Sequence, residues 1–93
     1  MKISIRAVRM NSRQCVLYDI VRAAESVVRN IAEGAGRWSA AECAKHYKIA
    51  RGEAMECASS LDVLKLRKLI ADEQYDRGLR LLEGVVAMLT KMV

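Results

Sequence analysis

Proline and phenylalanine are absent from this 93-residue chain, and glycine occurs only five times. β-Sandwiches and β-barrels need many turns, which proline and glycine usually form, so the composition disfavours both fold classes. No apolar run approaches the ~18 residues of a membrane-spanning helix, and the first residues lack the apolar segment of a secretory signal. We therefore expect a cytoplasmic protein without membrane association.

Metal-binding residue types are scarce. The sequence has one histidine, His46, and its three cysteines, Cys15, Cys43 and Cys57, form no Cys-x-x-Cys pair. A disulfide framework or a zinc site would need closer or paired cysteines. The sequence therefore predicts reduced thiols and no metal or other cofactor.

A catalytic group would have to use His46 as its base, with Glu42 and Cys43 one helical turn before it. Cys43 falls on an apolar stripe, where a thiol is usually inert packing. A di-iron site needs Glu-x-x-His pairs, but Glu42 and His46 are four residues apart. Residues 34–36 also lack the Lys-Ser/Thr that follows a phosphate-binding loop. We expect a protein without enzymatic activity.

The first of three predicted amphipathic helices begins at Asn11, with Gln14 as the partner in a capping box. Gly34 is its predicted stop, because glycine enters the left-handed conformation without a Cβ penalty. Apolar residues recur at steps of four and three and predict the face that packs on the core: Leu17, Val21, Ala24, Val28 and Ile31.

The second helix is expected to begin after Ser39, which forms a capping box with Glu42, and to end near residues 69–70. Its apolar stripe is Cys43, Tyr47, Ala50, Ala54, Cys57, Leu61 and Leu64. Apart from Tyr47, the first half of this stripe is small. A neighbouring helix can therefore approach closely there.

The third helix has Asp72 as its predicted N-cap and carries two adjacent apolar stripes. One consists of Tyr75, Leu79, Leu82, Val86, Leu89 and Val93, and the other of Leu81, Val85, Met88 and Met92. Together they cover roughly half of the helix circumference, which is more than one packing partner requires. We therefore expect two interfaces on this helix.

The shared seven-residue rhythm and the short connections predict an all-α, antiparallel up-down helical bundle. This domain spans residues 14–93. Residues 1–13 form a basic N-terminal arm with Lys2, Arg6, Arg9 and Arg13 and no acidic residue.

Charge provides the strongest functional indication, because 16 basic residues against 11 acidic ones give a net charge of +5. On the second helix, basic and acidic residues lie on opposite flanks of the apolar stripe, with Glu42, Glu53 and Glu56 on the acidic side. This pattern indicates either a solvated surface or a head-to-tail contact between subunits that closes into a ring. A ring of five copies would carry about +25 and attract a polyanion such as nucleic acid.

The candidate nucleic-acid-binding residues are basic side chains of the first two helices and of the turn between them: Arg22, Arg29, Arg37, Lys45, Lys48 and Arg51. No helix-turn-helix, zinc-finger or RNA-binding sheet motif is present. Trp38 is either a nucleic-acid contact or a lid on the end of the bundle.

Two blocks of residues resemble a known family. The first is Asn30-Ile31-Ala32-Glu33-Gly34, followed by Gly36-Arg37, Ser39 and Glu42; the second is Tyr47 to Gly52, with Glu56 and Leu61-Asp62 downstream. They resemble the four-helix-bundle proteins first named for open reading frames in 23S rRNA intervening sequences. The resemblance extends over about residues 15–93.

The resemblance implies a bundle that assembles as a ring, typically a pentamer, without known enzymatic activity. The accessory variability proteins of diversity-generating retroelements are a related branch that binds a reverse transcriptase and its RNA through a basic surface. Within the motif, we expect Asn30, Glu33 and Gly34 to be structural, with polar side chains that cap loop amides and the start of the next helix.

Family members usually have a complete helix before the one that begins near Asn11, where this chain has its basic arm. The main hypothesis is a non-catalytic homo-oligomer that binds RNA or a nucleic-acid enzyme such as a reverse transcriptase. The alternative is an interaction scaffold, in which the place of the missing helix is an apolar groove for a partner helix, lined partly by Leu81, Val85 and Met88.

Overall fold

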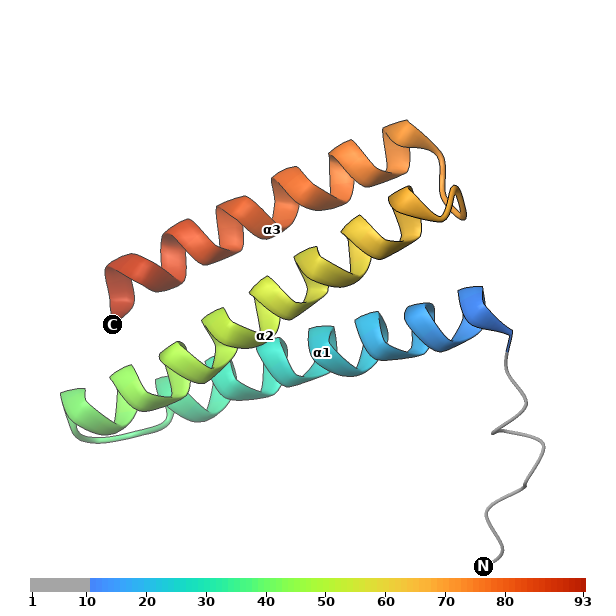
Figure 1. The fold of residues 1–93 in the computed structure, drawn as a ribbon. Helices are drawn as coiled ribbons and strands as arrows, with labels where there is room; N and C mark the ends of the chain where they lie inside the picture. Colours follow the sequence, from blue (N-terminus) through green and yellow to red (C-terminus); the bar gives the residue numbers. More distant parts are fainter. Residues whose placement is uncertain (1–10) are drawn as a thin grey trace, which may run out of the picture.

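The computed structural model describes residues 11–93, which form three helices and no strand. These are α1 (Ser12–Ala35), α2 (Ala40–Leu66) and α3 (Asp72–Met92), which run antiparallel in sequence order (Figure 1). The prediction of an all-helical chain is confirmed. Residues 1–10 of the predicted basic arm lie outside the described residues, while Ser12 and Arg13 already belong to α1.

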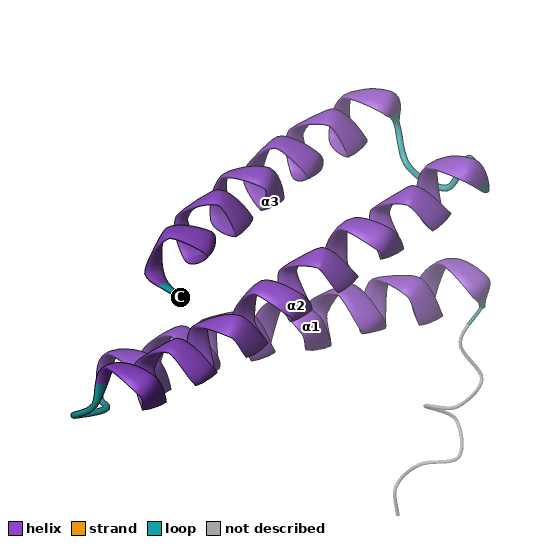
Figure 2. Cartoon of the chain, turned by 60° about the vertical axis from the view of Figure 1, so that its left-hand side comes forward, coloured by secondary structure: helices purple, strands orange, loops and turns teal. Residues whose placement is uncertain are grey.

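The central helix is α2, which lies between α1 and α3 (Figures 1 and 2). Each outer helix packs on α2, and the backbones of α1 and α3 do not contact each other. The shortest dimension of the Cα trace is 12 Å, close to the diameter of one helix. The three helices of this chain therefore form an open, single layer.

The predicted starts of α1 and α2 are confirmed. Asn11 Oδ1 accepts a hydrogen bond from the backbone N–H of Gln14 at 2.8 Å, and Gln14 Oε1 accepts one from the N–H of Asn11 at 3.0 Å. Ser39 Oγ accepts from the N–H of Glu42 at 3.1 Å, but within residues 11–93 the Glu42 side chain does not bond back to the N–H of Ser39, so only half of the predicted capping box forms. These side chains satisfy amides that have no partner inside the first turn of a helix.

The predicted end of α1 is wrong, because Gly34 is inside the helix and its φ is not positive. The C-cap is Gly36, with φ −86°. Its N–H donates to the carbonyl of Ala32 at 3.2 Å, and the N–H of Arg37 donates to the carbonyl of Gly34 at 3.1 Å. Gly34 therefore does not serve as a left-handed stop.

The connection from α2 to α3 also differs from the prediction. α2 ends at Leu66, about one turn earlier than expected, and Lys68 takes the left-handed conformation at φ 55°. The N-cap of α3 is Ala71, whose N–H donates to Gln74 Oε1 at 3.0 Å. Asp72 is the first helical residue, where its negative charge favours the positive end of the helix dipole.

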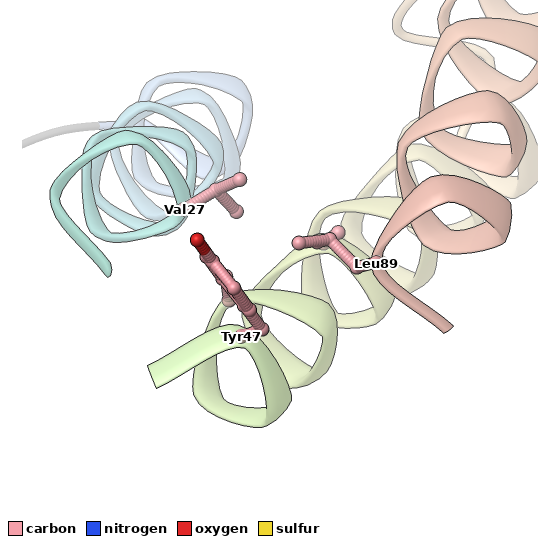
Figure 3. Packing of buried hydrophobic residues seen from close by; sticks show 5 residues of the cluster. Val27, Tyr47 and Leu89 are labelled. Atoms are coloured by element: carbon pink, nitrogen blue, oxygen red, sulfur yellow. The ribbon is translucent and has the colours of Figure 1, made fainter. Parts of the chain in front are cut away.

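The core lies where the three helices meet, and the predicted stripe of α2 forms its centre. Val27 of α1, Tyr47 of α2 and Leu89 of α3 point into this space (Figure 3), together with Ala50 and Ala54. Both alanines are 0% exposed. Because their side chains are small, the outer helices approach α2 closely.

The predicted packing face of α1 is wrong in part. Ala23 and Val27 are buried, whereas Val21 and Val28 are 55% and 68% exposed, and Ala24 is also exposed. Consecutive residues differ by about 100° around a helix, so the observed face is rotated from the predicted one. The buried residues of α1 are Ala23, Val27 and Gly34, and two of these three are small. No element of residues 11–93 covers Val21 and Val28.

On α3, one predicted interface is formed and the other is not. Leu89 is buried against α2, but Leu81 is 67% and Met88 61% exposed, while Val85 is half-buried against the core. Among residues 11–93, the backbone of α3 approaches only that of α2. None of the described helices combines the length and apolar character that crossing a membrane requires.

Candidate nucleic-acid interface

The α1–α2 turn brings four of the six predicted nucleic-acid-binding residues to one end of the molecule. His46 Nδ1 and Asn30 Oδ1 lie 3.3 Å apart, so their sequence neighbours Lys45 and Arg29 are at the same level of the helix pair. Arg37 lies in the turn itself, and Lys48 follows one turn after Lys45. We call Arg29, Arg37, Lys45 and Lys48 the basic end.

Two of the predicted arginines form ion pairs within the chain. Arg37 lies 2.6 Å from Glu33 Oε2, and Arg22 lies 4.0 Å from Glu56 Oε2. Arg51 is half-buried. The ion pairs of Arg22 and Arg37 and the partial burial of Arg51 make these three side chains less available to bind a phosphate.

The remaining three basic residues are Arg29, Lys45 and Lys48. All three are exposed, and none forms an ion pair within residues 11–93. Cationic side chains without an acidic partner are available to neutralise phosphates. They are therefore the best-placed phosphate contacts among the predicted residues.

Trp38 stands in the turn beside these residues and is 101% exposed. The sequence analysis gave two possible roles for Trp38, a nucleic-acid contact or a lid on the end of the bundle. The exposure argues against the lid, because the indole covers nothing in the described part of the chain. Exposed aromatic rings beside cationic groups are typical of nucleic-acid contacts.

In residues 11–93, the motif residues Asn30, Glu33 and Gly34 make other contacts than the predicted ones with loop amides. Asn30 Nδ2 donates to the carbonyl of Ser26 at 2.9 Å, which leaves Oδ1 directed at His46 across the helix interface. Glu33 holds Arg37. Gly34 permits close packing, since a Cβ atom at this position would lie 2.7 Å from Tyr47 Cε1.

The three acidic residues of the predicted subunit contact have different environments. Glu42 is exposed, Glu56 is paired with Arg22, and Glu53 is half-buried. Oε2 of Glu53 is buried without a hydrogen-bond partner in the described structure. Burial and the adjacent Glu56 carboxyl raise the pKa of Glu53, and Arg22 partly opposes this.

Two apolar stripes are exposed, of which the one on α3 was predicted to line a groove and the one on α1 was predicted to be in the core. The α1 stripe (Val21, Ala24 and Val28) borders a hollow of about 520 Å³. Ile20, Glu25 and Arg29 complete its lining, so Arg29 of the basic end also borders this apolar surface. The second surface is the α3 stripe, consisting of Leu81, Val85, Met88 and Met92. The sequence pattern predicts the α1 stripe to be in the core, because the spacing of apolar residues does not show which of two adjacent helix faces packs on another helix.

The residues considered for catalysis are not assembled around one point. His46 Nδ1 faces Asn30, while Cys43 Sγ donates to the carbonyl of Arg37 at 3.5 Å. Cys57 is buried, and burial raises the pKa of its thiol. Among residues 11–93, no three His, Cys, Asp or Glu side chains cluster as metal ligands would.

Comparison with curated proteins and with solved structures finds no match to this chain. The sequence model of one protein family, described as 23S rRNA-intervening sequence protein, matches residues 5–91. The match includes α1, α2, nearly all of α3, the Asn30–Gly34 motif and the basic end. The chain therefore belongs to the 23S rRNA-intervening sequence protein family.

Proposed function

We propose that the protein is a non-catalytic accessory subunit that assembles as a homo-oligomer and binds RNA or another nucleic acid through its basic end. The observation that carries this proposal is the exposure of Arg29, Lys45 and Lys48 without acidic partners in residues 11–93. The net charge of +5 adds a general attraction for polyanions. A 23S rRNA-intervening sequence family is compatible with a role beside RNA.

In the proposed assembly, head-to-tail contacts close a ring, with five subunits as the expected number. Glu42 is exposed on the acidic flank of α2 and is available to a neighbouring subunit. The ring repeats the basic end around one surface, so several phosphates are neutralised together. A nucleic-acid enzyme such as a reverse transcriptase, acting on the bound RNA in the cytoplasm, is the protein partner we propose.

Light scattering at low and high salt measures the mass of the assembly and so tests the proposed ring. The affinity for RNA, measured at several salt concentrations, tests whether the basic end binds it. A discrete mass near five subunits, with co-purifying nucleic acid released by salt, is expected. Replacing Arg29, Lys45 and Lys48 together by glutamine should weaken RNA binding. The slope of the logarithm of the binding constant against the logarithm of the salt concentration should become shallower by up to about 0.7–0.9 per lost phosphate contact.

The matched control replaces three basic residues of α3 by glutamine and removes the same charge: Arg77, Arg80 and Lys91. RNA affinity that falls equally in both variants would show a general charge effect, and the proposed surface would be wrong.

A second candidate function, an interaction scaffold, is favoured by the two exposed apolar stripes. Around the axis of α1, the exposed stripe and Ile31 lie on the same side of the buried Val27. Around the axis of α3, the exposed stripe, which includes Val85, lies to one side of the buried Leu89. Ile31 and Val85 both pack on the shared core. The two stripes therefore border the same open side of the layer, where one amphipathic helix of a partner would contact both. Binding of this kind is expected to be insensitive to salt.

A further inference from the structure

The position of Trp38 has no explanation in the packing of residues 11–93. Trp38 directly precedes the N-cap Ser39, a place where an apolar residue often packs on the fourth residue of the helix, here Cys43. That packing is not formed, because the indole is 101% exposed. Neither the core nor the helix cap therefore accounts for the only tryptophan of the sequence.

The surroundings of Trp38 are cationic and polar. The basic end contributes four positive side chains, against the acidic side chains of Glu33 and Glu42 in the same region. Arg37, the preceding residue, has its guanidinium fixed by Glu33 at 2.6 Å. A nucleic-acid strand bound to Arg29 and Lys45 would therefore pass beside an uncovered aromatic ring.

This combination fits an unpaired base better than a protein side chain. Aromatic anchors at protein interfaces are surrounded by other apolar groups that exclude water. Trp38 instead follows Arg37 and precedes Ser39, and the exposed α1 and α3 stripes lie along the helices, not in the turn. Single-stranded nucleic acids are bound by cationic groups that hold phosphates and by aromatic rings that stack on bases.

We infer that Trp38 is a stacking platform for an unpaired base, so that the basic end binds single-stranded nucleic acid in preference to a duplex. This inference rests on the proposed function, and it adds that the basic end prefers single-stranded to double-stranded nucleic acid. In a duplex the bases are already stacked on one another, so the ring has no base face to contact.

The fluorescence of the full-length protein tests this inference directly, because Trp38 is its only tryptophan. The probes are an oligouridylate of about 12 nucleotides, an oligothymidylate of the same length and an RNA duplex of that length. Affinity is measured in parallel from the anisotropy of labelled probes. The variants are Trp38→Ala, Trp38→Phe and, as a matched control, Tyr18→Ala, which removes an aromatic ring that is 59% exposed on α1.

The expected result is quenching of Trp38 that follows single-strand binding. Trp38→Ala should weaken oligouridylate binding roughly 5- to 150-fold, as expected for one lost base stack, and leave duplex binding unchanged. Trp38→Phe should retain most of the affinity, and Tyr18→Ala all of it. Quenching by oligouridylate alone assigns RNA, and equal quenching by oligothymidylate assigns single strands of either sugar.

Two results would overturn the inference in distinguishable ways. Salt-sensitive binding with unquenched Trp38, and with equal affinity in Trp38→Ala, would remove the stacking role and leave the basic end intact. No binding of any probe, single-stranded or duplex, would overturn both the inference and the proposed function.

Discussion

Gly34 of α1 lies directly against the ring of Tyr47 in α2, and a Cβ atom on this glycine would come within 2.7 Å of Cε1. Tyr47 is only 9% exposed, so its ring has little room to move away. The contact joins the last turn of α1 to the second turn of α2. It therefore determines how closely the two helices approach beside the basic end.

Gly34→Ala is expected to destabilise the fold by about 1–3 kcal/mol, because the added methyl group overpacks the contact with Tyr47. Gly52→Ala is the matched control, since a Cβ atom at Gly52 meets nothing within 4 Å. That substitution should stabilise α2 by about 0.5–1 kcal/mol through helix propensity. Urea unfolding followed by circular dichroism measures both, and equal effects of the two changes would contradict the packing role of Gly34.

Glu53→Gln is expected to stabilise the protein at neutral pH. Burial, followed by the adjacent Glu56 carboxyl, raises the pKa of Glu53 above its ordinary value of 4.5. A raised pKa in the folded state means that the protonated side chain favours folding, and that this stability is lost as pH rises through the folded pKa. The variant keeps a neutral side chain at every pH.

The stability difference between Glu53→Gln and the wild type should therefore be near zero at pH 4 and grow in favour of the variant as the pH rises to 7. Thermal unfolding at several pH values measures it. The control is Glu42→Gln, which removes an exposed carboxyl. A wild type that is more stable than Glu53→Gln at pH 7 would show that the carboxylate is favourably placed.

Asn30 and His46 are expected to be energetically coupled across the α1–α2 interface. Their side chains lie 3.3 Å apart, and a hydrogen bond between side chains contributes about 0.5–1.5 kcal/mol. A double-mutant cycle with Asn30→Ala and His46→Ala isolates this contribution from the bond between Asn30 and Ser26, which the first variant also removes. A coupling energy below about 0.3 kcal/mol would mean that the two residues act independently.

Leu81→Lys and Met88→Lys should leave the free energy of unfolding of the isolated chain within about 0.5 kcal/mol of the wild type, because both side chains are mostly exposed. If the α3 stripe is covered in an assembly or by a partner helix, the same changes should abolish that association. Light scattering and binding of a hydrophobic dye report the loss. Thr90→Lys is the control on an exposed position of α3, and an association that it disrupts equally would argue against the stripe.

Local patterns were the best predictors of this fold. The caps at Asn11 and Ser39 depend on neighbouring residues, and the stripe of α2 has the same face toward both outer helices, so the sequence identifies them. The face of α1 was misplaced because Ala23 and Gly34 pack through their small size, which hydrophobic spacing does not detect. Lysine is a poor predictor of a left-handed turn, so the turn at Lys68 was not predicted. The second helix was therefore predicted to be too long, and the third to start one residue later than it does.

In the candidate site, too, local contacts could be predicted from the sequence and contacts between helices could not. The ion pair of Arg37 and Glu33 follows from their spacing of four along α1 and the turn. The pair of Arg22 and Glu56 depends on the relative level of two helices, which no local pattern contains. The complete exposure of Trp38 likewise depends on what the rest of the chain leaves uncovered.

The central place of α2 has a consequence for hydrogen exchange. Because α1 and α3 pack on α2 and their backbones do not contact each other, either outer helix can separate while the other pair stays formed. Amides in the middle of α2, around Ala50 and Ala54, are thus exposed only when both pairs open. They should exchange slowest, with α1 and α3 exchanging in two separate, faster groups.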